Sequence, residues 1–381
     1  MPPWYADNKF VQFKYSNDRS LSELDKQKIL LWIKKGVPTE TKLSIENIKN
    51  EKKINSDYKK VILTIDYTIT KNTDEYRAFV FKNPINKDFI LKSVQINPGS
   101  NNIHHIAFLQ DPTNFSDSLQ NHSVGKGFEY NGIHATSPYA KIIYGWAPGA
   151  QPLNFSSNNG VKIKANNFFL VEMHYDGIEK GKEIKTEIEI GYFLPEELNF
   201  ISEVYLDVLL HSGEGCLQNP PFIIEKNTQK VFYMKTVLEK SISILGLSPH
   251  MHTAGSSFKV YAVKPNNDTI NLLNIDKWNP YWQEVYYPEE PIYLEKGSIL
   301  YAEASYNNTP SNFNLKLPLK EFKFGPSNKD EMMHCAFLYT EEADNLYTFT
   351  TSSKFNLQIL FVFVIVIIVL VIALKGFYSN R

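Results

Sequence analysis

Six side chains in this sequence could together hold metal ions that take part in redox chemistry. They form a His-His pair, a single His, a His-x-His pair and a late Met, namely His104, His105, His174, His250, His252 and Met332. Imidazole nitrogens bind copper well, and a thioether favours the soft Cu(I) state. Two sets of three ligands would each leave a coordination position open, which is typical of reactive rather than structural metal sites.

Each histidine group also has a simpler interpretation. His250 and His252 would project from one face of a strand about 7 Å apart, but two surface histidines are the alternative. His104 and His105 are adjacent, and adjacent strand residues point to opposite faces. Both can bind one ion only at a strand end, a bulge or a sharp twist, which the turn at 98–102 just upstream favours.

The two single residues are weaker signals when taken alone. His174 alternates with Leu170 and Glu172 along one face of an expected strand, where Glu172 could orient an imidazole. A structural histidine is the alternative there. Met332 could equally fill a hydrophobic core, as methionine usually does. The ordered combination of the four groups therefore carries more weight than any one of them.

The elements that must position these residues are short strands separated by turns. Strand-like runs occur at 61–67, 103–109, 168–175, 188–193, 204–210, 241–247, 258–263, 292–294, 299–305 and 335–339. Many short strands with Pro, Gly and Asn between them are typical of antiparallel sandwiches. We expect an all-β fold of two consecutive jelly-roll-like β-sandwich domains, at 58–197 and 198–348. Three of the six candidate ligands fall in each domain.

The first 57 residues differ from this pattern. Ser20 and Glu23 have the spacing of a capping box, and the apolar residues that follow predict a short amphipathic helix that Gly36 and Pro38 end. Residues 39–57 are polar and rich in Lys, Asn and Glu, which predicts a linker.

Near the other end, residues 355–374 form an uncharged run long enough to cross a bilayer as a helix. Because the run has no polar face, a buried core helix does not explain it. Its flanking charges, Lys354 before it and Lys375 and Arg381 after it, weakly favour a cytosolic C-terminus. The N-terminus has no signal-peptide pattern. We expect a single-pass membrane protein whose facing side the sequence leaves open.

Composition excludes several functions. Forty Lys and Arg against 41 Asp and Glu give no basic excess, so a general nucleic-acid binder is not expected. The sequence has no phosphate-binding glycine motif. Its two cysteines, Cys216 and Cys335, form no Cys-x-x-Cys pair, so a thiolate zinc site is not expected; two separate thiols are favoured over one disulfide.

The ordered ligand set over about residues 58–345 resembles the copper type II, ascorbate-dependent monooxygenases, the family of peptidylglycine α-hydroxylating monooxygenase and dopamine β-monooxygenase. The flanks 248–258, 282–286 and 330–333 look most like its bacterial branch. The resemblance implies an electron-transfer copper on His104, His105 and His174. It implies a second, oxygen-activating copper on the catalytic set His250, His252 and Met332. Ascorbate or another one-electron donor would be the co-substrate.

The N-terminal region supports that branch. Residues 1–38 look like the tail of a c-type cytochrome domain, which precedes the catalytic region in many bacterial relatives. The haem-attaching Cys-x-x-Cys-His is absent, so no haem is expected. We expect this remnant to pack on the catalytic domains.

The sequence departs from the animal enzymes at the substrate position. An Arg and a Tyr that hold the substrate carboxylate there correspond to Ser248 and Ala336 here. A peptide C-terminus is therefore not the expected substrate. Met333 competes with Met332 as the sulfur ligand; Met332 is favoured because it directly follows Asp-Glu. His334 could be an extra ligand, a proton relay or an ordinary polar neighbour.

These observations predict a membrane-anchored copper monooxygenase that hydroxylates a C–H bond of an unidentified small-molecule or peptide substrate with O₂. Its chemistry favours a lumenal, extracellular or envelope face over the cytosol. The alternative is a membrane-anchored structural or binding protein, such as an envelope or coat component, that keeps copper sites without turnover. A zinc hydrolase is disfavoured because it would require a carboxylate or a third His in place of Met332.

Overall fold

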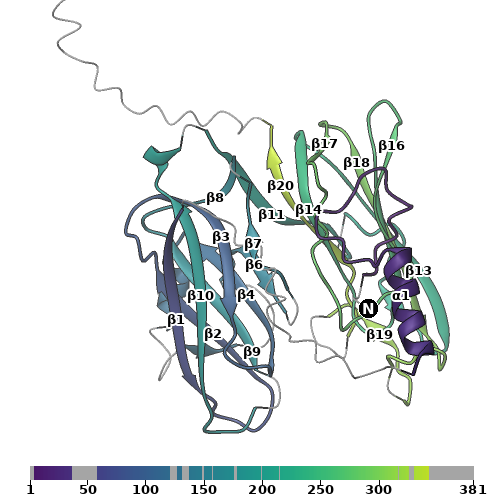
Figure 1. Ribbon diagram of the computed structural model, residues 1–381, viewed down its shortest axis with the longest axis horizontal. Helices are drawn as coiled ribbons and strands as arrows, with labels where there is room; N and C mark the ends of the chain where they lie inside the picture. The colour runs from purple at the N-terminus through teal and green to yellow at the C-terminus, as the bar shows by residue number, and fades with distance from the viewer. Residues whose placement is uncertain are drawn as a thin grey trace, which may run out of the picture.

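The computed structural model describes residues 4–36, 58–120, 127–130, 137–147, 150–156, 158–175, 178–198, 200–213, 215–315, 317–325 and 330–342. These residues are mostly β structure, as expected, with one longer helix near the N-terminus (Figure 1). The expected linker 39–57 and the expected membrane segment 355–374 lie outside the described residues. Among those described, no helix is both long and apolar enough to cross a bilayer.

The first half consists of two facing sheets. Its elements are β1 (Lys59–Thr68), β2 (Glu75–Lys82), β3 (Phe89–Asn97), β4 (Ile103–Asp111), α2 (Phe115–Gln120), β5 (Phe128–Glu129), β6 (Lys141–Trp146), β7 (Leu153–Asn154), β8 (Asn159–Ile163), β9 (Phe168–Tyr175), β10 (Glu183–Phe193) and η1 (Pro195–Glu197). One sheet has the order β5-β2-β9-β4-β6, and the other contains β1-β10-β3-β8. Alternating apolar residues from both sheets, such as Ile65, Val94, Phe108 and Val171, form the core between them.

The second half repeats this construction. Its strands are β11 (Ser202–His211), β12 (Ile223–Ile224), β13 (Thr228–Val237), β14 (Ile242–His250), β15 (Gly255–Val263), β16 (Thr269–Ile275), β17 (Ile292–Leu294), β18 (Ile299–Asn308), β19 (Phe322–Lys323) and β20 (His334–Glu341). The sheet β13-β18-β15-β16 faces β11-β20-β14-β17. Their core includes Phe232, Phe258, Leu272, Leu300 and Phe337.

A parallel pairing joins the halves. Ser202 and Glu203 at the start of β11 pair with Asn159 and Gly160 of β8. The two sheets thereby become one nine-stranded sheet that runs through both halves, and Figure 1 shows β11 between the first half and β14. The predicted boundary at 197/198 falls just before β11, and the division into two domains stays a prediction.

The N-terminal segment packs on the second half. Ala6 bridges to Ile275, and the Tyr15 hydroxyl donates to the Leu272 carbonyl oxygen at 2.8 Å. Arg19 pairs with Glu284 at 2.6 Å. The expected packing of this region is therefore confirmed for its first residues.

The helix that follows differs from the expectation. Helix α1 (Glu23–Lys34) is capped by Ser22, whose hydroxyl accepts from the Asp25 backbone N–H at 3.1 Å, so the capping box predicted at Ser20 and Glu23 is wrong by two residues. No residue of α1 is buried, so its apolar side chains form no core-facing stripe. Its end is as predicted, with Gly36 at a φ of 79°.

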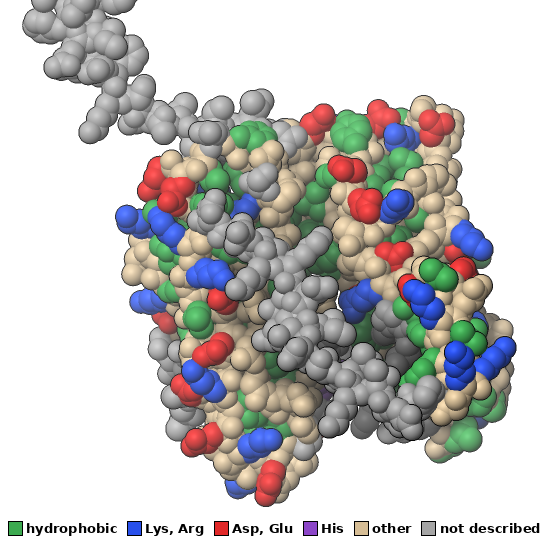
Figure 2. All heavy atoms as spheres, in the orientation of Figure 1, with side chains coloured by type: hydrophobic (Ala, Val, Ile, Leu, Met, Phe, Trp, Pro, Cys, Tyr) green, Lys and Arg blue, Asp and Glu red, His purple; other side chains and the backbone are tan. Residues whose placement is uncertain are grey.

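Charge is mixed over the visible surface. Figure 2 shows Lys and Arg side chains interspersed with Asp and Glu on that face, without a stripe of one sign. This distribution agrees with the net charge of −1.

Candidate metal centres

Three histidines of the first half meet at the end of a strand pair. His105 lies opposite His174 across the antiparallel strands β4 and β9, and the register shifts between Ile103 and His105. His104 is the extra residue of this bulge, so it turns toward the same site as its neighbour. One ring nitrogen from each histidine lies within 4.8 Å of the others. The predicted distortion is therefore confirmed, and three imidazoles converge as a metal requires.

The turn before β4 explains why the chain bends here. Gly99 has a φ of 75°, and a Cβ at that position would collide with the Lys185 carbonyl group. Only glycine fits such a left-handed, closely packed position. This turn leads directly into the bulge that carries His104.

His174 is fixed by residues of β2. Its side chain is buried, and the ring of Tyr76, which lies opposite it in β2, stacks on it with centroids 4.1 Å apart and planes 15° apart. Asp74 Oδ2 lies 3.7 Å from His174 Nε2. Glu172, the partner expected from the sequence, is buried between Ala78 and Ala107 in register. Tyr76 and Asp74 are contacts of His174 that sequence reasoning missed.

The second pair of histidines lies at a strand end. His250 is the last residue of β14, and His252 follows in the connection to β15. The expectation that both lie within one strand is wrong, because the chain leaves the sheet at Met251, which is fully buried in the core. The two rings are still neighbours, with centroids 5.0 Å apart and planes 84° apart.

Hydrogen bonds place the ring proton of each histidine on Nδ1. His252 Nδ1 lies 2.9 Å from the Asp330 carbonyl oxygen, which can only accept, so Nδ1 carries the proton. His250 Nδ1 lies 2.5 Å from Gln283 Oε1, and Gln283 Nε2 donates to the Pro280 carbonyl at 2.9 Å, which fixes the amide orientation. In a neutral ring the lone pair is then on Nε2. Burial lowers the pKa of His252, which favours this neutral form.

Glu331 holds the His252 loop against the segment that carries Met332. Its buried carboxylate accepts from the backbone N–H groups of His252 at 2.9 Å and Ala254 at 2.6 Å. Burial raises the pKa of Glu331 to about 7, although these hydrogen bonds oppose the shift. The Tyr306 hydroxyl donates to the Met332 carbonyl oxygen at 2.7 Å.

The two adjacent methionines have different environments. Met333 is fully buried in the core of the second half, whereas Met332 is half-buried on the opposite side of the chain. Asp330 on one side of Met332 bonds His252, and His334 on the other side stacks on His250. This arrangement favours Met332 over Met333 as the sulfur ligand.

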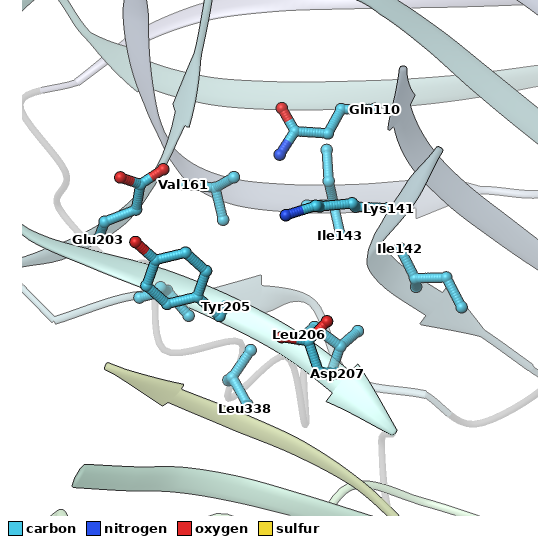
Figure 3. Close-up of a pocket in the computed structure, with 11 residues that line it drawn as sticks. Gln110, Lys141, Ile142, Ile143, Val161, Glu203, Tyr205, Leu206, Asp207 and Leu338 are labelled. Atoms are coloured by element: carbon cyan, nitrogen blue, oxygen red, sulfur yellow. The ribbon is translucent and has the colours of Figure 1, made fainter. Parts of the chain in front are cut away.

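A separate pocket lies where the halves meet. It is lined by Gln110, Lys141, Ile142, Ile143, Val161, Glu203, Val204, Tyr205, Leu206, Asp207 and Leu338 (Figure 3). Its volume of about 40 Å³ holds water rather than an organic substrate. None of the six candidate ligands lines it.

The family assignment comes from the second half. Residues 226–359 match the family model described as copper type II ascorbate-dependent monooxygenase, C-terminal domain. The second half of the chain is thus similar to the C-terminal domain of the copper type II ascorbate-dependent monooxygenases, and the match supports that family. The matched residues include His250, His252 and Met332, whereas the three histidines of the first half lie outside the match.

The similar solved structures share little sequence with this chain. PNGF-II has 10% identity and a TM-score of 0.31, over 75% of this chain and 66% of that one. PNGase F, a glycosylasparaginase from Flavobacterium meningosepticum, has 10% identity and a TM-score of 0.30, over 74% and 96%. The VP2 subviral particle of infectious bursal disease virus has 8% identity and a TM-score of 0.19, over 76% and 72%. Scores this low carry no argument about function.

Proposed function

We propose that this chain is a two-copper monooxygenase that hydroxylates a C–H bond of an organic substrate with O₂ and a one-electron donor such as ascorbate. The family assignment supports copper-dependent monooxygenase chemistry in general. The observation that supports the two-metal form is the convergence of His104, His105 and His174 in the half of the chain outside that match.

The chain's own residues fit this role. The first copper would be held by His104, His105 and His174, and the second by His250, His252 and Met332. Copper at these positions would supply one-electron transfer and O₂ activation. Gln283 and the Asp330 carbonyl orient the imidazoles of the second site, and Glu331 keeps its loop in place. Tyr76 restricts the ring of His174.

Further parts of the proposal concern the domain types, the N-terminal region and attachment to a membrane. The sandwiches would be jelly-roll-like domains, and residues 1–38 would correspond to the C-terminal part of a c-type cytochrome domain. Residues 355–374 would anchor the enzyme in a bilayer, with the copper domains on a lumenal, extracellular or envelope face. Nucleic acid is not a proposed partner.

Copper content and oxygen uptake test the function together. We expect the purified full-length protein to bind two copper ions per chain and to consume O₂ when ascorbate and a hydroxylatable substrate are present. Copper binding without O₂ consumption across a broad substrate panel would instead favour the non-catalytic structural protein. Binding of fewer than two coppers would contradict the two-metal proposal.

A further inference from the structure

Three histidines form a row across neighbouring strands of the second half. His334, the first residue of β20, lies opposite His250 of β14 on one side and His211 of β11 on the other. Residues directly opposite each other in antiparallel strands project from the same face, with Cβ atoms about 5 Å apart. The row therefore places a third imidazole beside the pair His250 and His252.

The ring of His334 lies flat against the ring of His250. Their centroids are 4.6 Å apart and their planes differ by 27°. His250 also bonds Gln283 through Nδ1, at an edge of the ring. The hydrogen bond fixes which ring edge faces Gln283, and the stacked ring blocks rotation of the imidazole toward β20.

The geometry disfavours His334 as a ligand itself. His252 meets His250 edge-on, at 84°, whereas His334 meets it face-on. Among the described residues, the one set of three His, Cys, Asp or Glu side chains whose ligand atoms lie within 4.8 Å of one another is that of the first half. The nitrogens of His250, His252 and His334 therefore do not converge as those of His104, His105 and His174 do.

We propose that His334 is a positioning residue, which holds His250 in the orientation that the second copper requires by stacking on its ring. This role rests on the proposed function, because it assumes a copper on His250, His252 and Met332. This role requires a flat ring at position 334 but does not require a ring nitrogen.

Two substitutions distinguish the effect of the flat ring from the effect of its nitrogens. His334→Phe keeps a flat ring against His250, and His334→Ala removes it. His211→Ala is the matched control, because His211 is an exposed histidine at the other end of the row. Cu(I) affinity is measured on the full-length protein by competition with a chromophoric chelator, with the Cu(II) EPR spectrum recorded alongside. The first copper serves as an internal reference.

We expect His334→Ala to lower the Cu(I) affinity of the second site by about 10- to 100-fold, the usual effect of removing a residue that orients a ligand. The Phe variant should stay within about threefold of wild type, with an unchanged EPR spectrum, and His211→Ala should match wild type. Equal losses in the Phe and Ala variants would overturn the proposal in favour of a third imidazole ligand. No loss in either would show that stacking has no role. A wild-type protein that lacks the second copper would refute the proposed function before any variant is compared.

Discussion

His105 and His174 lie opposite each other across β4 and β9, and a bulge immediately before this pair brings His104 to the same place. In a regular strand the side chain of His104 would point to the other face of the sheet. The grouping therefore depends on one extra residue in β4, which the Gly99 turn makes possible.

Loss of one member of this group should affect one copper only. We expect His104→Ala to lower the copper content from two ions per chain to one, because two imidazoles bind copper far less tightly than three. His104 is exposed, so the fold should tolerate the change. Metal analysis after dialysis checks this, with His211→Ala as the control. An unchanged copper content would remove His104 from the site.

The two adjacent methionines should respond in opposite ways. Met332→Ile should abolish O₂ consumption and leave the melting temperature nearly unchanged, because this half-buried side chain is the proposed sulfur ligand. Met333→Ala should instead lower the free energy of unfolding by about 2–5 kcal/mol, since Met333 is fully buried in the core. Urea unfolding and oxygen-electrode assays on both variants make the comparison. The reversed pattern would assign the ligand to Met333.

The Glu331→Gln substitution tests whether the Glu331 carboxylate holds the His252 loop in place. An amide has one acceptor oxygen where the carboxylate has two, so one of the two N–H groups, of His252 or Ala254, would lose its partner. We expect a loss of about 1–3 kcal/mol in the free energy of unfolding. Glu303→Gln is the control, since its partly exposed contact with Lys259 at 3.6 Å should contribute under about 1 kcal/mol. Similar losses in both variants would argue against a special role for Glu331.

Lys92 should make the free energy of unfolding depend on pH in the alkaline range. It is 2% exposed, and burial lowers its pKa from 10.5 to about 8. Between pH 8 and 10.5 the unfolded chain binds more protons at this lysine than the folded protein does, so the free energy of unfolding rises with pH. The gain should approach about 3 kcal/mol at most.

The measurement is the difference in unfolding free energy between wild type and Lys92→Met across this range. Subtracting the variant cancels groups that titrate alike in both proteins. A difference that stays flat from pH 8 to 10.5 would show that Lys92 keeps an ordinary pKa in the folded state.

The sequence predicted β4 and β9, which carry the candidate ligands of the first half, but it missed other strands. Residues 168–175 match β9, because a run of apolar residues broken only by Glu172 and His174 is readable as a strand. Strand β3 was missed because Lys92 and Ser93 interrupt its apolar pattern, although both are buried. Strand β13 had a readable signal, since buried Phe232 and Met234 alternate with exposed neighbours.

The partners of the ligands could not be predicted in the same way. Tyr76 reaches His174 through the pairing of β2 with β9, and Gln283 reaches His250 across 33 residues of sequence. Such contacts depend on strand register, which local patterns do not specify. The bulge at His104 was predictable, because a geometric conflict between adjacent histidines required it.

The parallel pairing of β8 with β11 has a mechanical consequence. A single hydrogen-bonded sheet crosses from one half to the other. The halves therefore cannot move apart as two independently hinged domains without breaking backbone hydrogen bonds between β8 and β11. Their relative motion is limited to twisting and flexing of that sheet. Under the proposed function, electron transfer between the two copper sites would not wait for a large closing motion of the halves, so its rate should be insensitive to solvent viscosity.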